Sequence, residues 1–149
     1  MFKRILAAVG GNEDSLEPAR VAARLAAQVG AELAFVSVFR GPSTVFGDPD
    51  YADRLLPRLA EAEQTLAKAR AMAVAEGVAE PDLQTLEGDA AEAIVKHARA
   101  GDYDHVVLGT HRRGRIGVAL LGSVSGAVAA RSGRPVMVVP EPQSHAAGK

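Results

Sequence analysis

Residues 102–126 read DYDHVVLGTHRRGRIGVALLGSVSG, and a strand, a loop and a helix are predicted to follow one another in this stretch. The apolar run His105–Leu108 predicts a buried strand that ends at Gly109. A loop rich in glycine and arginine, Thr110–Gly117, comes next, and Ala119–Arg131 has the composition of a helix. A strand followed by a helix-length connection is half of a parallel unit, so this stretch predicts a parallel sheet.

Further apolar runs predict strands elsewhere in the chain: Phe2–Val9, Glu32–Phe39, Leu83–Leu86 and Pro135–Val139. A helix-length segment separates each predicted strand from the next. This alternation predicts an α/β fold, in which an open, mostly parallel sheet of five strands carries helices on both faces.

The helices between these strands have recognisable ends. Ser15 is expected to cap the first helix, and Gly30 to end it. The second helix, Ala52–Glu76, contains Pro57, which we expect to kink it or to delay its start. Asp89 begins an Asp-x-x-Glu capping box that opens a third helix.

The composition is that of an ordinary one-domain protein. The chain has 149 residues, of which 48% are hydrophobic and 23% charged, so disorder of the whole chain is excluded. The absence of cysteine excludes a disulfide scaffold, thiolate metal sites and cysteine nucleophiles. A net charge of −1 argues against nucleic acid as a partner. We expect one domain over residues 1–140 and a disordered tail over 141–149.

Hydropathy bears on location. No apolar run reaches the roughly 18 residues of a membrane span, so no membrane partner is expected. The apolar stretch Ile5–Val9 is too short for the core of a signal peptide. We therefore predict a cytoplasmic protein.

The predicted sheet indicates where a ligand would bind. Ligands of open α/β sheets lie beyond the carboxyl ends of the strands. Two predicted strands end in glycine there, at Gly10 and Gly109. Backbone N–H groups, Arg112, Arg113 and the start of a helix near Ser123 favour a phosphate site. On the residues alone, a flexible loop with solvated arginines is an equal alternative.

Several chemical signatures are missing from the sequence. There is no P-loop, no G-x-G-x-x-G after the first strand, no catalytic triad and no zincin motif. The four histidines are scattered, so we predict surface or satisfied polar histidines and no metal site. No catalytic residues are assigned.

The stretch that follows Gly109 carries a family pattern, G-x2-G-x9-G-[ST], followed by Val-Ser. Nine residues, Arg113–Leu121, precede Gly122 and Ser123, as the pattern requires. The segments FKRILAAV, EGDAAEAIVKHA, DYDHVVLGTH and RPVMVVP are similar to other parts of the same family. From Phe2 to Pro140 the chain resembles a single-domain member of the universal stress protein family, of the UspA type.

This resemblance implies a Rossmann-like fold of the adenine nucleotide alpha hydrolase type, with strand order 3-2-1-4-5. It also implies a homodimer, which we place at the last strand, Val136–Val139, because an edge strand invites pairing. It implies ATP, with Mg²⁺, as the ligand of members that bind nucleotide. Val9 and Val38 would line the base. The residues expected around the nucleotide are Ala8, Val9, Gly10, Val38, Leu108, Gly109, Arg112, Arg113, Gly122, Ser123 and Val124.

Two positions depart from the family pattern. Gly10 stands where the family usually has Asp, and the lost charged hydrogen bond would cost roughly 1.5–3 kcal/mol. Arg112 stands in place of the second glycine, where it would either crowd or contact the phosphates. Two functions are therefore open: a stress-response module that binds ATP or a related adenine nucleotide, and a nucleotide-independent stress protein that acts through its dimer surface.

An enzyme is the least expected function. Slow ATP hydrolysis would need a positioned base, for which His111, Asp14 and Asp89 are candidates by residue type only. No carboxylate pair accompanies them, so we predict that the protein is not an enzyme.

Overall fold

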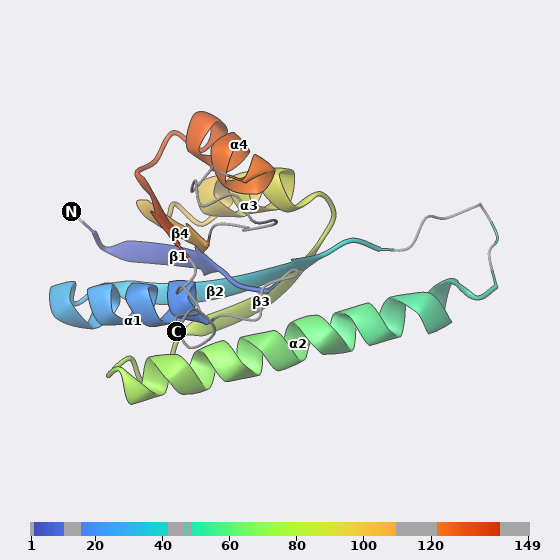
Figure 1. The fold of residues 1–149 in the computed structure, drawn as a ribbon, viewed down its shortest axis with the longest axis horizontal. Helices are drawn as coiled ribbons and strands as arrows, with labels where there is room; N and C mark the ends of the chain where they lie inside the picture. The colour runs from blue at the N-terminus through green and yellow to red at the C-terminus, as the bar shows by residue number, and fades with distance from the viewer. Residues whose placement is uncertain (1, 11–15, 42–46, 48, 110–121, 141–149) are drawn as a thin grey trace, which may run out of the picture.

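The computed structural model describes residues 2–10, 16–41, 47, 49–109 and 122–140. Strands and helices alternate through this part of the chain (Figure 1). The elements are β1 (Arg4–Ala8), α1 (Glu17–Val29), β2 (Glu32–Phe39), α2 (Tyr51–Ala75), β3 (Asp82–Glu87), α3 (Ala90–Ala100), β4 (His105–Gly109), α4 (Ser123–Arg131) and β5 (Val136–Val139).

The strands form one parallel sheet in the order β3-β2-β1-β4-β5, which confirms the predicted topology. β1 lies in the centre, where Ala7 is level with Phe35 of β2 and Val107 of β4. Because every pairing is parallel, the carboxyl ends of the strands meet at one edge of the sheet. The residues that directly follow β1, β2 and β4 begin at this edge.

Alternate side chains of the strands enter two hydrophobic cores. Ile5, Ala7 and Phe35 face α1 and α2, and are fully buried. Leu6 and Val36 point the other way and pack with α3 and α4. Helices thus cover both faces of the sheet, as predicted (Figure 1).

The first helix begins later than the sequence indicated. Ser15 lies outside the described residues, and Leu16 occupies the cap position without a side-chain hydrogen bond. Pro18 in the first turn favours this start, because its fixed φ suits a helix and its missing N–H would be unpaired there anyway. Gly30 ends α1 in the left-handed conformation, with φ +71°, which confirms that prediction.

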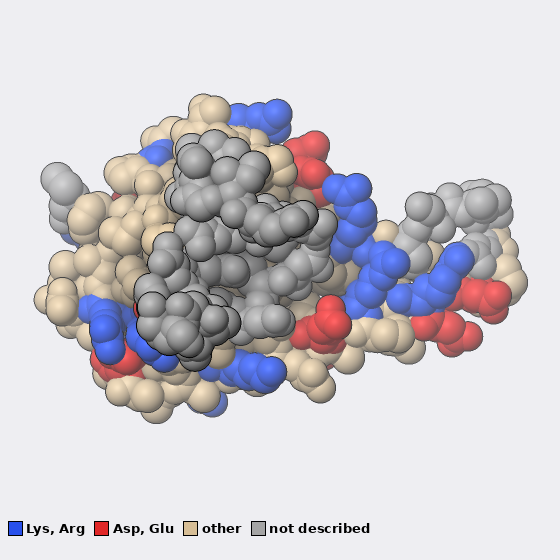
Figure 2. Space-filling model, viewed as in Figure 1, with Lys and Arg blue, Asp and Glu red and all other residues tan. Residues whose placement is uncertain are grey.

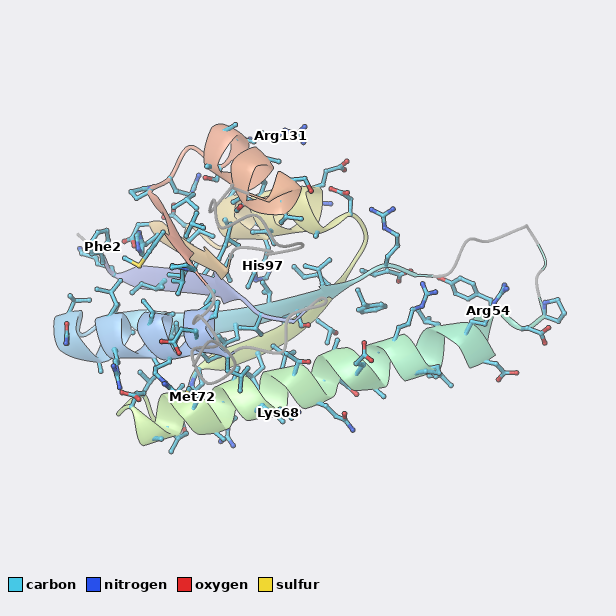
Figure 3. All side chains as sticks on the ribbon, in the orientation of Figure 1. Phe2, Arg54, Lys68, Met72, His97 and Arg131 are labelled. Atoms are coloured by element: carbon cyan, nitrogen blue, oxygen red, sulfur yellow. The ribbon has the colours of Figure 1, made fainter. Side chains whose placement is uncertain are left out.

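The long helix α2 runs through Pro57. It begins at Tyr51, so the predicted delay of its start is wrong. The carbonyl oxygen that loses its helical partner belongs to Asp53, in the exposed first turn, where water can satisfy it. Figure 1 shows the first turns of α2 extending past the sheet. Phe2 and Arg54 accordingly lie at opposite ends of the molecule (Figure 3).

The predicted start is correct for α3 but not for α4. Asp89 caps α3, as predicted, because its carboxylate accepts a hydrogen bond from the Glu92 N–H at 3.1 Å. The predicted start of the next helix at Ala119 is wrong. Gly122 has an extended backbone, with ψ 166°, and α4 begins at Ser123.

Candidate functional site

Three of the predicted site residues come together at the carboxyl edge of the sheet. Val9 follows β1 directly, and its N–H donates to the carbonyl oxygen of Val36 on β2 at 2.9 Å. Val38 lies near the end of β2, and Gly109 ends β4 on the other side of β1. The backbones of these predicted residues are therefore neighbours. The side chains of Val9 and Val38 face opposite sides of the sheet, because Val9 packs with α1 and α2 whereas Val38 packs with α3 and α4.

Ala8 and Leu108, the other two strand residues predicted for the site, have side chains that pack toward the core. Ala8 packs against the core on the α3–α4 side, and Leu108 is buried in that core. Their contribution to the edge is therefore their backbone, since their side chains are directed into the packed interior.

Gly10 adopts a conformation that explains why it is glycine. Its φ is +104°, which L side chains rarely adopt. A Cβ atom added here would lie 2.6 Å from Ser37 Oγ and 3.4 Å from Thr65 Cγ2. The backbone angle and the neighbouring hydroxyl both disfavour a side chain at the position where the family pattern has a carboxylate.

The start of α4 also belongs to this edge. The helix returns from the end of β4 to the beginning of the parallel strand β5, so its N-terminus lies at the carboxyl side. Ser123 and Val124 are exposed in its first turn. Gly122 has no side chain to cap α4, so within the described residues no cap side chain pairs with the first N–H groups of the helix. Arg112 and Arg113 lie outside the described residues.

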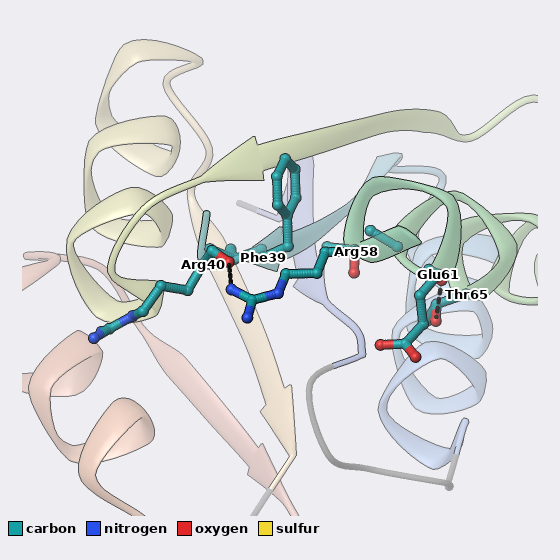
Figure 4. Close-up of a pocket in the computed structure, with 8 residues that line it drawn as sticks. Phe39, Arg40, Arg58, Glu61 and Thr65 are labelled. Atoms are coloured by element: carbon teal, nitrogen blue, oxygen red, sulfur yellow. Dashed lines mark hydrogen bonds between the residues drawn. The ribbon is translucent and has the colours of Figure 1, made fainter. Parts of the chain in front are cut away.

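A pocket of about 260 Å³ opens between the end of β2 and one face of α2 (Figure 4). Its residues are Ser37–Arg40 from β2 and Arg58, Glu61, Ala62 and Thr65 from α2. The sequence analysis identified only Val38 among them. The available signal was the spacing of the α2 residues at i, i+3, i+4 and i+7, which places them on one helix face. Charged residues with this spacing also occur on solvated helices, so the signal alone is not specific.

Hydrogen bonds hold the arginines of the pocket. A terminal nitrogen of Arg58 donates to the carbonyl oxygen of Arg40 at 2.6 Å (Figure 4). Arg40 in turn donates to the Asp89 carboxylate at 3.2 Å. Figure 2 shows Lys and Arg side chains gathered at the end of the molecule into which α2 extends, with Asp and Glu beside them. The pocket therefore has mixed charge at its rim.

The inner wall of the pocket is polar at one point. Ser37 is only 2% exposed and lines the pocket from β2. The Thr65 hydroxyl donates to the backbone carbonyl oxygen of Glu61 at 3.0 Å. This hydrogen bond does not involve the side-chain carboxylate of Glu61. The pocket is thus lined by a buried serine and a glutamate together with the apolar residues Phe39 and Ala62.

The described residues contain no group of three or more His, Asp or Glu side chains that could hold a metal ion. Both described histidines lie away from the strand-end edge. His97 stacks on Tyr103, with ring centroids 5.8 Å apart. His105 is buried at the start of β4, and neither ring nitrogen has a hydrogen-bond partner among the described residues. The prediction of a satisfied histidine is therefore wrong for His105. His111 and His145 lie outside the described residues.

No helix in the described segments is both long and apolar enough to cross a membrane.

Comparisons with known proteins agree on one family. The sequence model of the Universal stress protein family matches residues 1–140. The universal stress protein in QAH/OAS sulfhydrylase 3′ region of Thermus aquaticus is 36% identical over 139 residues, which cover 93% of this chain and 99% of that protein.

Solved structures show the same fold. Universal stress protein UspA from Lactobacillus plantarum superposes with a TM-score of 0.81 at 20% identity, over 93% of this chain and 97% of that one. A universal stress protein in complex with cAMP has a TM-score of 0.71 at 26% identity, over 92% of this chain and 96% of that one.

Proposed function

The chain belongs to the universal stress protein family, and from this premise we propose that it is a regulatory module of the stress response that binds ATP or a related adenine nucleotide. The observation that carries the proposal is the meeting of the β1, β2 and β4 ends with the N-terminus of α4 at one edge of the sheet. Such an edge is where open α/β sheets bind ligands. The solved relative in complex with cAMP supports an adenine nucleotide as the ligand class.

We place the base near the ends of β1 and β2, beside Val9, Gly10 and Val38, and the phosphates toward α4. Gly109, Gly122, Ser123 and Val124 then lie on the ribose and phosphate side. The N–H groups of the first turn and the positive end of the α4 dipole favour an anion there. Arg112 and Arg113 belong to the same proposal by their place in the sequence.

Mg²⁺ would accompany ATP rather than occupy a protein cage. Magnesium keeps most of its water and takes one or two protein oxygens plus phosphate oxygens. The lack of a three-ligand cluster among the described residues is compatible with that mode of binding. We assign no catalytic residue and propose binding without hydrolysis, which a phosphate-release assay with ATP and Mg²⁺ would test.

We also propose a cytoplasmic homodimer that pairs through β5. The strand order places β5 at an edge, where its backbone groups on one side have no partner strand among the described elements. Val136–Val138 are half-buried, which leaves apolar surface for a second copy to cover. The nucleotide would control the protein by changing its affinity for partners.

Calorimetric titration of nucleotide-free protein with ATP, with and without Mg²⁺, tests the proposed function. We expect binding in the micromolar range. The second candidate, a nucleotide-independent protein that acts through its dimer surface, is favoured by Gly10, whose conformation disfavours the usual carboxylate. No binding at millimolar ATP would overturn the first proposal in favour of the second.

A further inference from the structure

A side chain at position 10 cannot easily supply the carboxylate that the family pattern has there. Gly10 has φ +104°, and its added Cβ would lie 2.6 Å from the hydroxyl oxygen of Ser37. Nucleotide binding at this edge would therefore need another acceptor for the hydrogen-bond donors of the nucleoside.

The helix α2 lies against the same space. The methyl carbon Cγ2 of Thr65 is 3.4 Å from the position of that added Cβ. Glu61 precedes Thr65 by one helical turn, and its carbonyl oxygen accepts the Thr65 hydroxyl at 3.0 Å. Residues four apart lie on one helix face, and both line the pocket beside Ser37 (Figure 4). Glu61 thus lies one helical turn from the α2 residue that approaches position 10.

The Glu61 carboxylate is available to a ligand. It forms no ion pair or hydrogen bond with another described residue. Arg58, on the same helix face, instead donates to the carbonyl oxygen of Arg40, and Arg40 donates to Asp89. Ser37, which is only 2% exposed, lines the same pocket.

The pocket suits part of a nucleotide. At about 260 Å³ it is smaller than the roughly 300–1,000 Å³ of sites for drug-sized ligands, so it would hold a base or a ribose and leave the phosphates outside. A carboxylate only accepts hydrogen bonds, whereas a serine hydroxyl both donates and accepts. The amino group of adenine and the ribose hydroxyls are the donors that a nucleoside offers to a carboxylate.

We infer that Glu61 of α2 serves as the nucleoside-binding carboxylate of this protein, accepting a hydrogen bond from the base amino group or from a ribose hydroxyl, with the Ser37 hydroxyl as its neighbour in the pocket. The inference rests on the proposed function and adds to it a specificity-determining residue from an element that the family pattern does not mark.

The test compares Glu61→Gln with Glu63→Gln in the full chain. Both changes remove one negative charge from exposed positions of α2, but Glu63 does not line the pocket. Calorimetric titrations use ATP, 2′-deoxyATP and inosine triphosphate, which carries a carbonyl in place of the amino group. Thermal unfolding without nucleotide checks that both variants fold like the wild type.

Glu61→Gln is expected to weaken ATP binding about tenfold or more, as loss of a charged hydrogen bond does, whereas Glu63→Gln stays within about twofold of the wild type. If the base amino group is the donor, inosine triphosphate loses the Glu61 effect and 2′-deoxyATP keeps it. A 2′-hydroxyl donor gives the reverse, and an effect kept by both analogues assigns the donor to the 3′-hydroxyl.

Two results would overturn the inference, and they are distinguishable. Equal ATP affinity for Glu61→Gln and the wild type would remove Glu61 from the site and leave the proposed function intact. No ATP binding by the wild type would remove the proposed function and this inference together.

Discussion

His105 is a buried titratable residue whose side chain lacks hydrogen-bond partners among the described residues. It is 5% exposed, its ring lies 4.5 Å from that of Phe2, and its nitrogens have no hydrogen-bond partner among the described residues. Burial lowers the pKa of His105 below its usual 6.5, and the charge of Asp104 offsets part of this effect. Burial also lowers the pKa of His97. Burial in the folded protein therefore favours the neutral form of both imidazoles.

Stability should consequently fall on acidification. Below about pH 6.5 the unfolded chain binds protons that the folded chain does not, and each such proton lowers the free energy of unfolding by up to about 1.4 kcal/mol per pH unit. We expect this loss between pH 6.5 and the lower folded pKa. His105→Phe should reduce the pH dependence of urea unfolding measured between pH 5 and 7.5. An unchanged dependence would show that His105 is not its source.

The backbone conformation of Gly10 leads to a second prediction at the scale of single residues. Gly10→Ala should destabilise the protein by about 1–3 kcal/mol, because φ +104° is strained for alanine and the methyl group meets Ser37 Oγ. Gly77→Ala is a matched control, with φ +106° and only the ordinary contact of Ala27 Cβ at 3.8 Å from its added Cβ. Denaturant unfolding of both variants separates the contact from the backbone strain. Equal losses in the two would mean that the Ser37 contact contributes nothing.

At the scale of elements, the cap of α3 links helix stability to the pocket. The Asp89 carboxylate accepts both the Glu92 N–H and the guanidinium of Arg40. Asp89→Ala should cost about 0.5–2 kcal/mol in the free energy of unfolding, the usual range for loss of an N-cap. Asp89→Asn, which keeps a capping oxygen, should recover most of it. A loss as large for asparagine as for alanine would contradict the capping role.

The elements also show where local patterns predict well. The roles of Gly30 as the end of α1 and of Asp89 as the N-cap of α3 were predicted correctly. Each role depends on residues within a few positions of it in the sequence. The start of α4 was predicted wrongly. Ala119–Leu121 are residue types that favour a helix, but α4 begins after Gly122 because Gly122 has an extended backbone. The helix predicted over Ala52–Glu76 does contain Pro57 in its interior, and only the alternative of a delayed start is wrong.

At the scale of the whole molecule, the proposed homodimer would pair through the edge strand β5. Val138 is half-buried on this edge strand and belongs to neither of the described cores. We expect Val138→Lys to convert a dimer into a monomer in sedimentation experiments at micromolar concentration, because a lysine on an edge strand opposes strand pairing. Val29→Lys, at an exposed position on α1, is the control. A wild-type protein that sediments as a monomer would refute the dimer.

The sheet as a whole was accessible from the sequence. Short apolar runs separated by helix-length segments predict five parallel strands, since buried strands and amphipathic helices have different local periods. The order of those strands came from the family resemblance, because strand pairing joins residues such as Ala7 and Val107 that lie far apart in the chain.

The pocket, in contrast, depends on packing. Ser37, Glu61 and Thr65 are unremarkable in the sequence, and they meet only because α2 lies along the end of β2. The same packing sets the contact that accompanies glycine at position 10. Local composition can encode a strand, a cap or a glycine-rich loop. The neighbours of Gly10 follow from the way α2 and β2 pack, which no single stretch of the chain specifies.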